Sequence, residues 1–132
     1  MRDSLVNCWD KSLWIKFVMK PFSLLIPVPD VPKGLVWYQQ AFPMAEAIYL
    51  PEFDFTLLQI GNFQIEIVQA DQKVNSGHDG VVLYWHVENL TEMMQYLESL
   101  GTNLYRGPLA IENNLQMCQF KDPFGNLIGL KG

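Results

Sequence analysis

Val28-Pro29-Asp30 and Val87-Glu88-Asn89 occupy the same place in a pattern that the chain contains twice. They lie 59 residues apart (87 − 28), and each closes a run of apolar, strand-like residues. A side-chain oxygen of Asp30 or Asn89 can accept a backbone N–H from the first turn of a helix, so each predicts a helix start. Each predicted helix is followed by strand-like segments that end in a Gly-Asn turn, at Gly61-Asn62 and at Gly125-Asn126. The sequence therefore predicts two copies of a strand–helix–three-strand module.

The predicted modules fill most of the chain. Module one spans residues 21–69, a polar linker spans 70–80, and module two spans 81–132. The first strands are expected at Phe22–Val28 and Val81–Val87. Residues 1–20 lie outside the repeat and form an N-terminal extension, either a tail or a helix that covers a neighbouring surface.

Composition excludes several classes of protein. The chain has 132 residues, enough for one domain with its own core. Its net charge of −5 disfavours a nucleic-acid partner, because neutralising phosphates needs a basic face. Cys8 and Cys118 are too few and too far apart for a disulfide framework or a zinc motif, which fits a cytoplasmic protein. No apolar run reaches the ~18–20 residues of a membrane span, and no signal peptide is recognisable. No membrane partner is expected.

Two motifs carry a resemblance to a known family. Phe120-Lys121-Asp122-Pro123-Phe124-Gly125-Asn126-Leu127-Ile128 is similar to the closing turn and strand of the vicinal oxygen chelate superfamily, also called the glyoxalase/bleomycin resistance/dioxygenase family. Val28-Pro29-Asp30 with Trp37-Tyr38 resembles the family's opening strand and first helix. The resemblance covers the chain from about residue 21 to its end. It implies an α+β fold of two βαβββ modules, whose curved mixed sheet forms a cup with the helices on its outer face.

The resemblance also implies where a metal would bind. Metal-using members carry His or Glu ligands on the first and last strands of each module. The corresponding positions here are Ser23, Val82, Glu66 and Gly129. Only Glu66 has a competent ligand group, because the other side chains are poor or absent donors. One carboxylate alone cannot hold a transition metal against water. Aligning the Gly-Asn turns instead pairs Glu66 with Leu130, which is no better. We therefore expect no metal and no other cofactor.

A metal-free cup can still bind a ligand, as drug-sequestering relatives do in a dimeric groove. By strand alternation its wall includes Gln64, Glu66, Tyr84 and His86, while Ser23 and Val82 occupy the former metal positions. Tyr105 and Arg106 are rim candidates. Glu66 is either a ligand contact or a family remnant that is hydrated or paired with a neighbour such as Lys131. We expect a homodimer, by resemblance alone.

Three functions follow from these residues. The first expectation is a metal-independent protein that binds a small molecule, an antibiotic or another amphipathic aromatic compound. The alternative is a lyase, isomerase or dioxygenase of the same superfamily with an atypical site, for which Glu66 and His86 are the catalytic candidates. A second alternative is an interaction module with a vestigial site. The residues leave enzyme activity open and favour a binding role.

Overall fold

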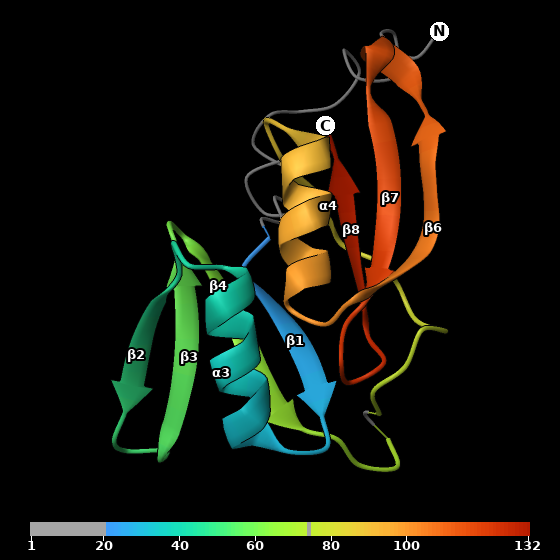
Figure 1. The fold of residues 1–132 in the computed structure, drawn as a ribbon. Coiled ribbons are helices and arrows are strands. Elements are labelled where there is room, and N and C mark those ends of the chain that lie inside the picture. Colours follow the sequence, from blue (N-terminus) through green and yellow to red (C-terminus); the bar gives the residue numbers. More distant parts are fainter. Residues whose placement is uncertain (1–20, 74) are drawn as a thin grey trace, which may run out of the picture.

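The computed structural model describes residues 21–73 and 75–132, and the expected N-terminal extension lies outside them. Module one comprises β1 (Ser23–Val28), α3 (Val31–Ala41), β2 (Glu46–Leu50), β3 (Phe55–Ile60) and β4 (Phe63–Gln69). Module two comprises β5 (Tyr84–His86), α4 (Leu90–Ser99), β6 (Asn103–Ala110), a 3₁₀ turn η1 (Glu112–Asn114), β7 (Gln116–Lys121) and β8 (Leu127–Lys131). This element order, visible in Figure 1, confirms the predicted α+β fold of two βαβββ modules.

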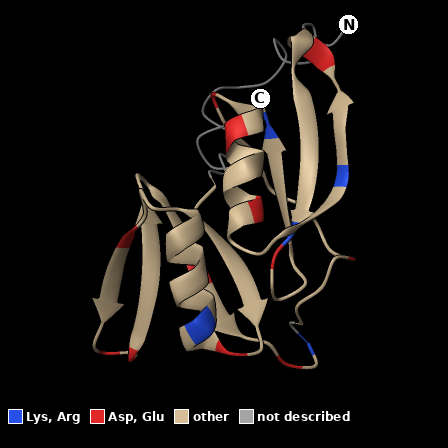
Figure 2. Ribbon diagram, in the orientation of Figure 1, with Lys and Arg blue, Asp and Glu red and all other residues tan. Residues whose placement is uncertain are grey.

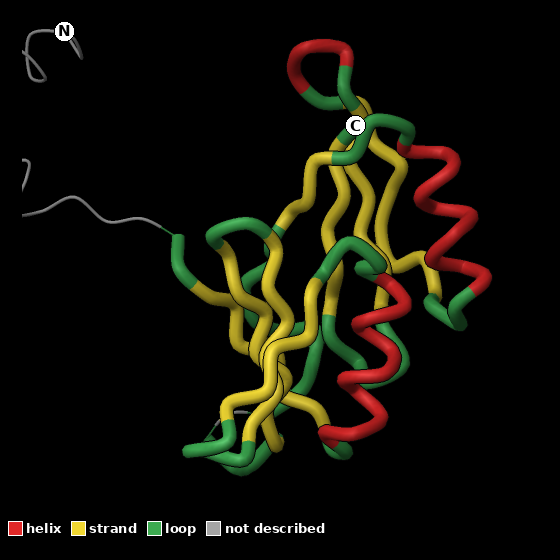
Figure 3. The backbone as a smooth tube through the Cα atoms, turned by 90° about the vertical axis from the view of Figure 1, so that its left-hand side faces the viewer, coloured by secondary structure: helices red, strands yellow, loops and turns green. Residues whose placement is uncertain are grey.

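The two sheets have the same topology. Their strand orders are β1-β4-β3-β2 and β5-β8-β7-β6. In each, the first and last strands of the module pair in parallel and the remaining neighbours are antiparallel. Figure 3 shows both helices on one side of the strands. The side of the two sheets opposite the helices is here called the open face.

Local signals at the helix starts operate as the sequence predicts. The Asp30 carboxylate accepts a hydrogen bond from the Lys33 backbone N–H at 3.1 Å. The Asn89 side chain accepts the corresponding bond from Glu92 at 3.0 Å. Each cap satisfies a donor that the first helical turn would otherwise leave unpaired. Both predicted caps are confirmed.

A single apolar core lies between the sheets and the helices. Alternate residues of β4 and β7 point into it, and Ile65, Ile67, Cys118 and Phe120 are fully buried. The core cluster continues from Tyr38 on α3 to Leu97 on α4, so both modules contribute to it. Because the buried apolar surface is shared, each module stabilises the other.

Polar bonds also join the modules. The buried Tyr38 hydroxyl donates to Oδ2 of Asp122, whose Oδ1 accepts from the backbone N–H groups of Phe124 and Asn126 and so fixes the β7–β8 turn. Three further bonds cross between modules: Trp37 Nε1 to the Leu100 carbonyl at 2.8 Å, Tyr96 Oη to the Gln40 carbonyl at 2.5 Å, and Asn126 Nδ2 to the Pro27 carbonyl at 2.8 Å.

The strand β5 is shorter than predicted. It begins at Tyr84, whereas the alternation of apolar residues predicts a strand from Val81. Its parallel partner β8 starts only at Leu127, and Tyr84 is level with Gly129. By this register Leu127 is level with Val82, so residues before Val82 have no facing strand to pair with, and Val81 is 99% exposed. In the described part of the chain, no helix is long and apolar enough to cross a membrane.

Candidate functional site

On the open face of module one, Glu66 is the central polar residue. Its neighbours Ile65 and Ile67 are buried in the core, so strand alternation directs Glu66 to the opposite side. Glu66 is half-buried and level with Leu25 on β1, and Gln64 is level with Ser23. Among residues 21–73 and 75–132, no ion pair joins Glu66 to Lys131 or to another cation. This half of the face therefore presents a carboxylate with its charge available to a ligand.

On the open face of module two, a tyrosine covers a glycine. Tyr84 is level with Gly129, and a Cβ placed on Gly129 would lie 2.6 Å from Cδ1 of the Tyr84 ring. Nε2 of Gln119 donates a hydrogen bond of 2.6 Å to the Tyr84 hydroxyl. The Lys131 ammonium lies 5.1 Å from the centre of the same ring, within the range of a cation–π contact. These contacts hold the ring against β8.

The strand registers relate the two halves. Leu25 pairs with Glu66 in module one, and Tyr84 pairs with Gly129 in module two. Leu25 and Tyr84 are again 59 residues apart (84 − 25), so Gly129 is the counterpart of Glu66. The Tyr84 ring therefore occupies the space into which a ligating side chain on β8 would project. The residues present do not fit a transition-metal site, and the described residues contain no group of three His, Cys, Asp or Glu placed to hold one.

Cationic side chains lie beside Tyr84 and Tyr105 in module two. Arg106 is level with Gln119 and so lies on the open face, after a register shift that interrupts β6 between Leu104 and Arg106. The Lys121 ammonium lies 5.3 Å from the centre of the Tyr105 ring. Both predicted rim residues, Tyr105 and Arg106, are exposed. The open face thus carries a carboxylate on one half and ammonium and guanidinium groups on the other.

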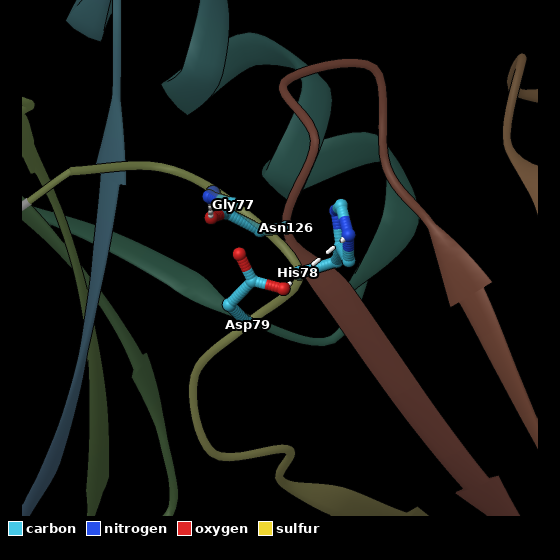
Figure 4. Close-up of polar contacts among 4 residues, drawn as sticks. All are labelled: Gly77, His78, Asp79 and Asn126. Atoms are coloured by element: carbon cyan, nitrogen blue, oxygen red, sulfur yellow. Dashed lines mark hydrogen bonds and ion pairs between the residues drawn. The ribbon is translucent and has the colours of Figure 1, made fainter.

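The linker between the modules contacts the β7–β8 turn, as Figure 4 shows. The Gly77 backbone N–H donates to Oδ1 of Asn126 at 3.0 Å, which attaches the linker to the β7–β8 turn. Nε2 of His78 lies 3.4 Å from Oδ1 of Asp79, and the His78 ring centre is 5.5 Å from that of Tyr105. His78 therefore lies beside a candidate ligand-binding residue, a position that its polar sequence surroundings gave no reason to expect.

The remaining predicted site residues are less closely grouped. Ser23 is exposed on β1, and Val82 is half-buried just before β5 begins. His86 is exposed at the end of β5, where it borders a cavity on the helix side together with Trp85. Glu66 belongs to β4 of the other module. Sequence reasoning missed Gln119, although it alternates with the buried residues Cys118 and Phe120 and could have been placed on the open face by that pattern.

A buried ionisable pair lies outside the candidate site. Burial raises the pKa of Asp122, and its hydrogen bonds from Tyr38 and three backbone N–H groups oppose that rise. Burial is also the main reason that the pKa of Tyr38 is well above its ordinary value, followed by the charge and the hydrogen bond of Asp122. Both groups belong to the core under the sheets, so their role is structural.

Comparison with known proteins gives a consistent result. The model of the glyoxalase/bleomycin resistance protein/dioxygenase superfamily matches residues 19–130. No curated protein matches the chain in sequence.

Several solved structures share the fold at low identity. A protein from the mobile metagenome of V. pseudocholerae is 22% identical, with a TM-score of 0.68, over 86% of this chain and 94% of that one. A superfamily member from Sphaerobacter thermophilus is 19% identical, with a TM-score of 0.67, over 87% and 98%. The fosfomycin resistance protein FosX of Listeria monocytogenes is 18% identical, with a TM-score of 0.61, over 86% and 88%.

Proposed function

Because the chain belongs to the glyoxalase/bleomycin resistance protein/dioxygenase superfamily, we propose that it binds a small molecule on its open face without a metal. The observation that carries this proposal is the Tyr84 ring packed over Gly129. A carboxylate or imidazole at that position would be needed to complete a metal site, and the ring takes its space. An aromatic ring fixed by a hydrogen bond is instead a surface on which a planar ligand can pack.

The charges on the open face favour a ligand with mixed polarity. Glu66 can accept hydrogen bonds from an amine or hydroxyl group of the ligand. Lys131 and Lys121, beside the two tyrosines, can bind acceptor or anionic groups. An aromatic, drug-like molecule with groups of both kinds matches this arrangement, and antibiotics are the class we propose to test first. One structural neighbour is named as a fosfomycin resistance protein, so that drug belongs in the test panel.

Homodimerisation is part of this proposal. Leu25 and Leu109 are 47% and 44% exposed, and their registers place both on the open face. A second copy that covers these side chains would also deepen the ligand site by adding a further wall. Analytical ultracentrifugation tests this point directly, since a monomer at micromolar concentration would contradict it.

A ligand screen by melting temperature tests the binding function. A ligand present at one hundred times its Kd stabilises the folded protein by about 2.7 kcal/mol, which raises the melting temperature by several degrees. Glu66→Gln should weaken a ligand that carries an amine, whereas Glu98→Gln, on the exposed side of α4, should not. Conversion of the ligand into a product would replace the binding function with an enzymatic one. Failure of every compound in a broad antibiotic and aromatic panel would favour an interaction module.

A further inference from the structure

A cavity of about 630 Å³ lies on the helix side of the sheets, away from the open face. It is bounded by the end of α3, the first turns of α4 and the strand β5, so both modules form its walls. Small-molecule sites in proteins commonly occupy about 300–1,000 Å³ and occur where two units meet. Its apolar lining includes Phe42, Met44, Ile60, Trp85, Met93 and Leu97.

Part of the cavity lining is aromatic and packed. The ring centres of Phe42 and Trp85 are 4.8 Å apart, and the ring centre of Phe63 is 5.9 Å from that of Trp85. The walls are more adaptable, because Met44 is 62% exposed and Met93 is half-buried. Methionine side chains adjust their rotamers to ligands of different shape. The cavity therefore suits a bulky apolar body.

The rim of the cavity is acidic. Glu88 and Glu92 both line it and both are exposed. Within residues 21–73 and 75–132, no lysine or arginine forms an ion pair with either carboxylate. Figure 2 shows acidic segments on α4 and no basic ones. The Asn89 side chain accepts one of the backbone N–H groups at the start of α4. The carboxylates of Glu88 and Glu92 therefore determine the sign of the charge at the rim.

From this combination of an aromatic lining and an acidic rim, we infer that the cavity is a second binding site, specific for lipophilic organic cations. The cationic centre lies at Glu88 and Glu92, and the apolar substituents pack against Phe42 and Trp85. This site is separate from the open face and does not depend on the function proposed for that face.

Two ions of the same shape and opposite charge provide the test. Tetraphenylphosphonium and tetraphenylborate each carry four phenyl groups around one charged atom. Titration of the full-length ¹⁵N-labelled protein should give a Kd for the phosphonium that is at least roughly tenfold lower than the Kd for the borate. The chemical shifts of the backbone amides of Trp85 to Met93 should change when the phosphonium is added. Equal Kd values for the two ions would overturn the inference. Shifts confined to Tyr84 and Gln119 on the open face would overturn it as well.

A charge-matched pair of variants tests the rim. Glu88→Gln/Glu92→Gln should raise the Kd of the phosphonium about tenfold, because two exposed charge contacts are lost. Glu98→Gln/Glu112→Gln removes the same net charge outside the cavity and should leave the Kd within about twofold. Melting curves confirm that both variants fold. Equal weakening in the two variants would show a general charge effect and contradict a site at the cavity.

Discussion

The proposal of a metal-independent site on the open face depends on the contact between Tyr84 and Gly129. Gly129→Ala should lower the free energy of unfolding by about 1–3 kcal/mol, because its Cβ would be forced against the Tyr84 ring. Tyr84→Ala should remove that clash, so the double variant should lose less stability than the sum of the two single changes. Urea unfolding of all four proteins measures the coupling. Additive losses would mean that the ring does not lie over Gly129.

The Tyr38–Asp122 pair gives a prediction about pH. The folded protein holds the Tyr38 proton at a higher pKa than the ordinary value of 10.0, so it binds more protons than the unfolded chain above that pH. The stability that depends on protonated Tyr38 is therefore complete below about pH 10 and falls as the pH rises further. Tyr38→Phe lacks this dependence.

At neutral pH, Tyr38→Phe should lower the free energy of unfolding by about 1–3 kcal/mol, because a buried acceptor on Asp122 loses its donor. The difference between the two proteins should shrink above pH 10. Unfolding with urea at increasing pH measures it, with Tyr105→Phe as a control for an exposed tyrosine. A difference that stays constant with pH would contradict the linkage to Tyr38.

At the scale of the elements, α3 packs on the first sheet through a glycine. A Cβ on Gly34 would lie 2.8 Å from Cγ2 of Ile67 and 2.9 Å from Cγ2 of Val28. Gly34→Ala should therefore cost about 1–3 kcal/mol in spite of the higher helix propensity of alanine. Gly80→Ala, where nothing lies within 4 Å, is the matched control and should be nearly neutral. A stabilised Gly34→Ala protein would show that α3 can move away from the sheet.

Local signals account for the elements that the sequence predicts correctly. The caps at Asp30 and Asn89 depend on residues at most three positions apart, so the pattern contains them. The module topology follows because the same pattern occurs twice. The start of β5 and the pairing of Tyr84 with Gly129 depend on the register between strands far apart in the chain, which alternation alone does not specify. For the same reason, the sequence shows that Gly129 lacks a ligand group but not that a ring covers it.

At the scale of the whole molecule, the modules are joined by Asn126. Its side chain accepts from Gly77 in the linker and donates to the Pro27 carbonyl on β1. Asn126→Ala should lower the free energy of unfolding by about 1–3 kcal/mol, because both bonds are lost. Circular dichroism and fluorescence should still report one coincident transition, since the core is shared. Asn103→Ala, exposed on β6, is the control, and two separate transitions in the Asn126 variant would show that the modules fold independently.

The helix-side cavity also belongs to this scale. Its walls come from α3, α4, β3 and β5, which lie in different modules. Sequence periodicity assigns Phe42 and Trp85 to apolar faces but gives no relative position for those faces. A site between two modules therefore appears only when their docking is known.

Metal content is the most direct test of a metal-independent site on the open face. The protein is purified without chelator or affinity tag, its metals are quantified, and its melting temperature is measured with added Ni²⁺, Zn²⁺, Mn²⁺ or Fe²⁺. The Tyr84 ring fills the space over Gly129, the counterpart of Glu66. We therefore expect far less than one metal per chain and no ion-specific shift in melting temperature. Near-stoichiometric metal, or a rise of several degrees with one ion, would contradict the proposed function.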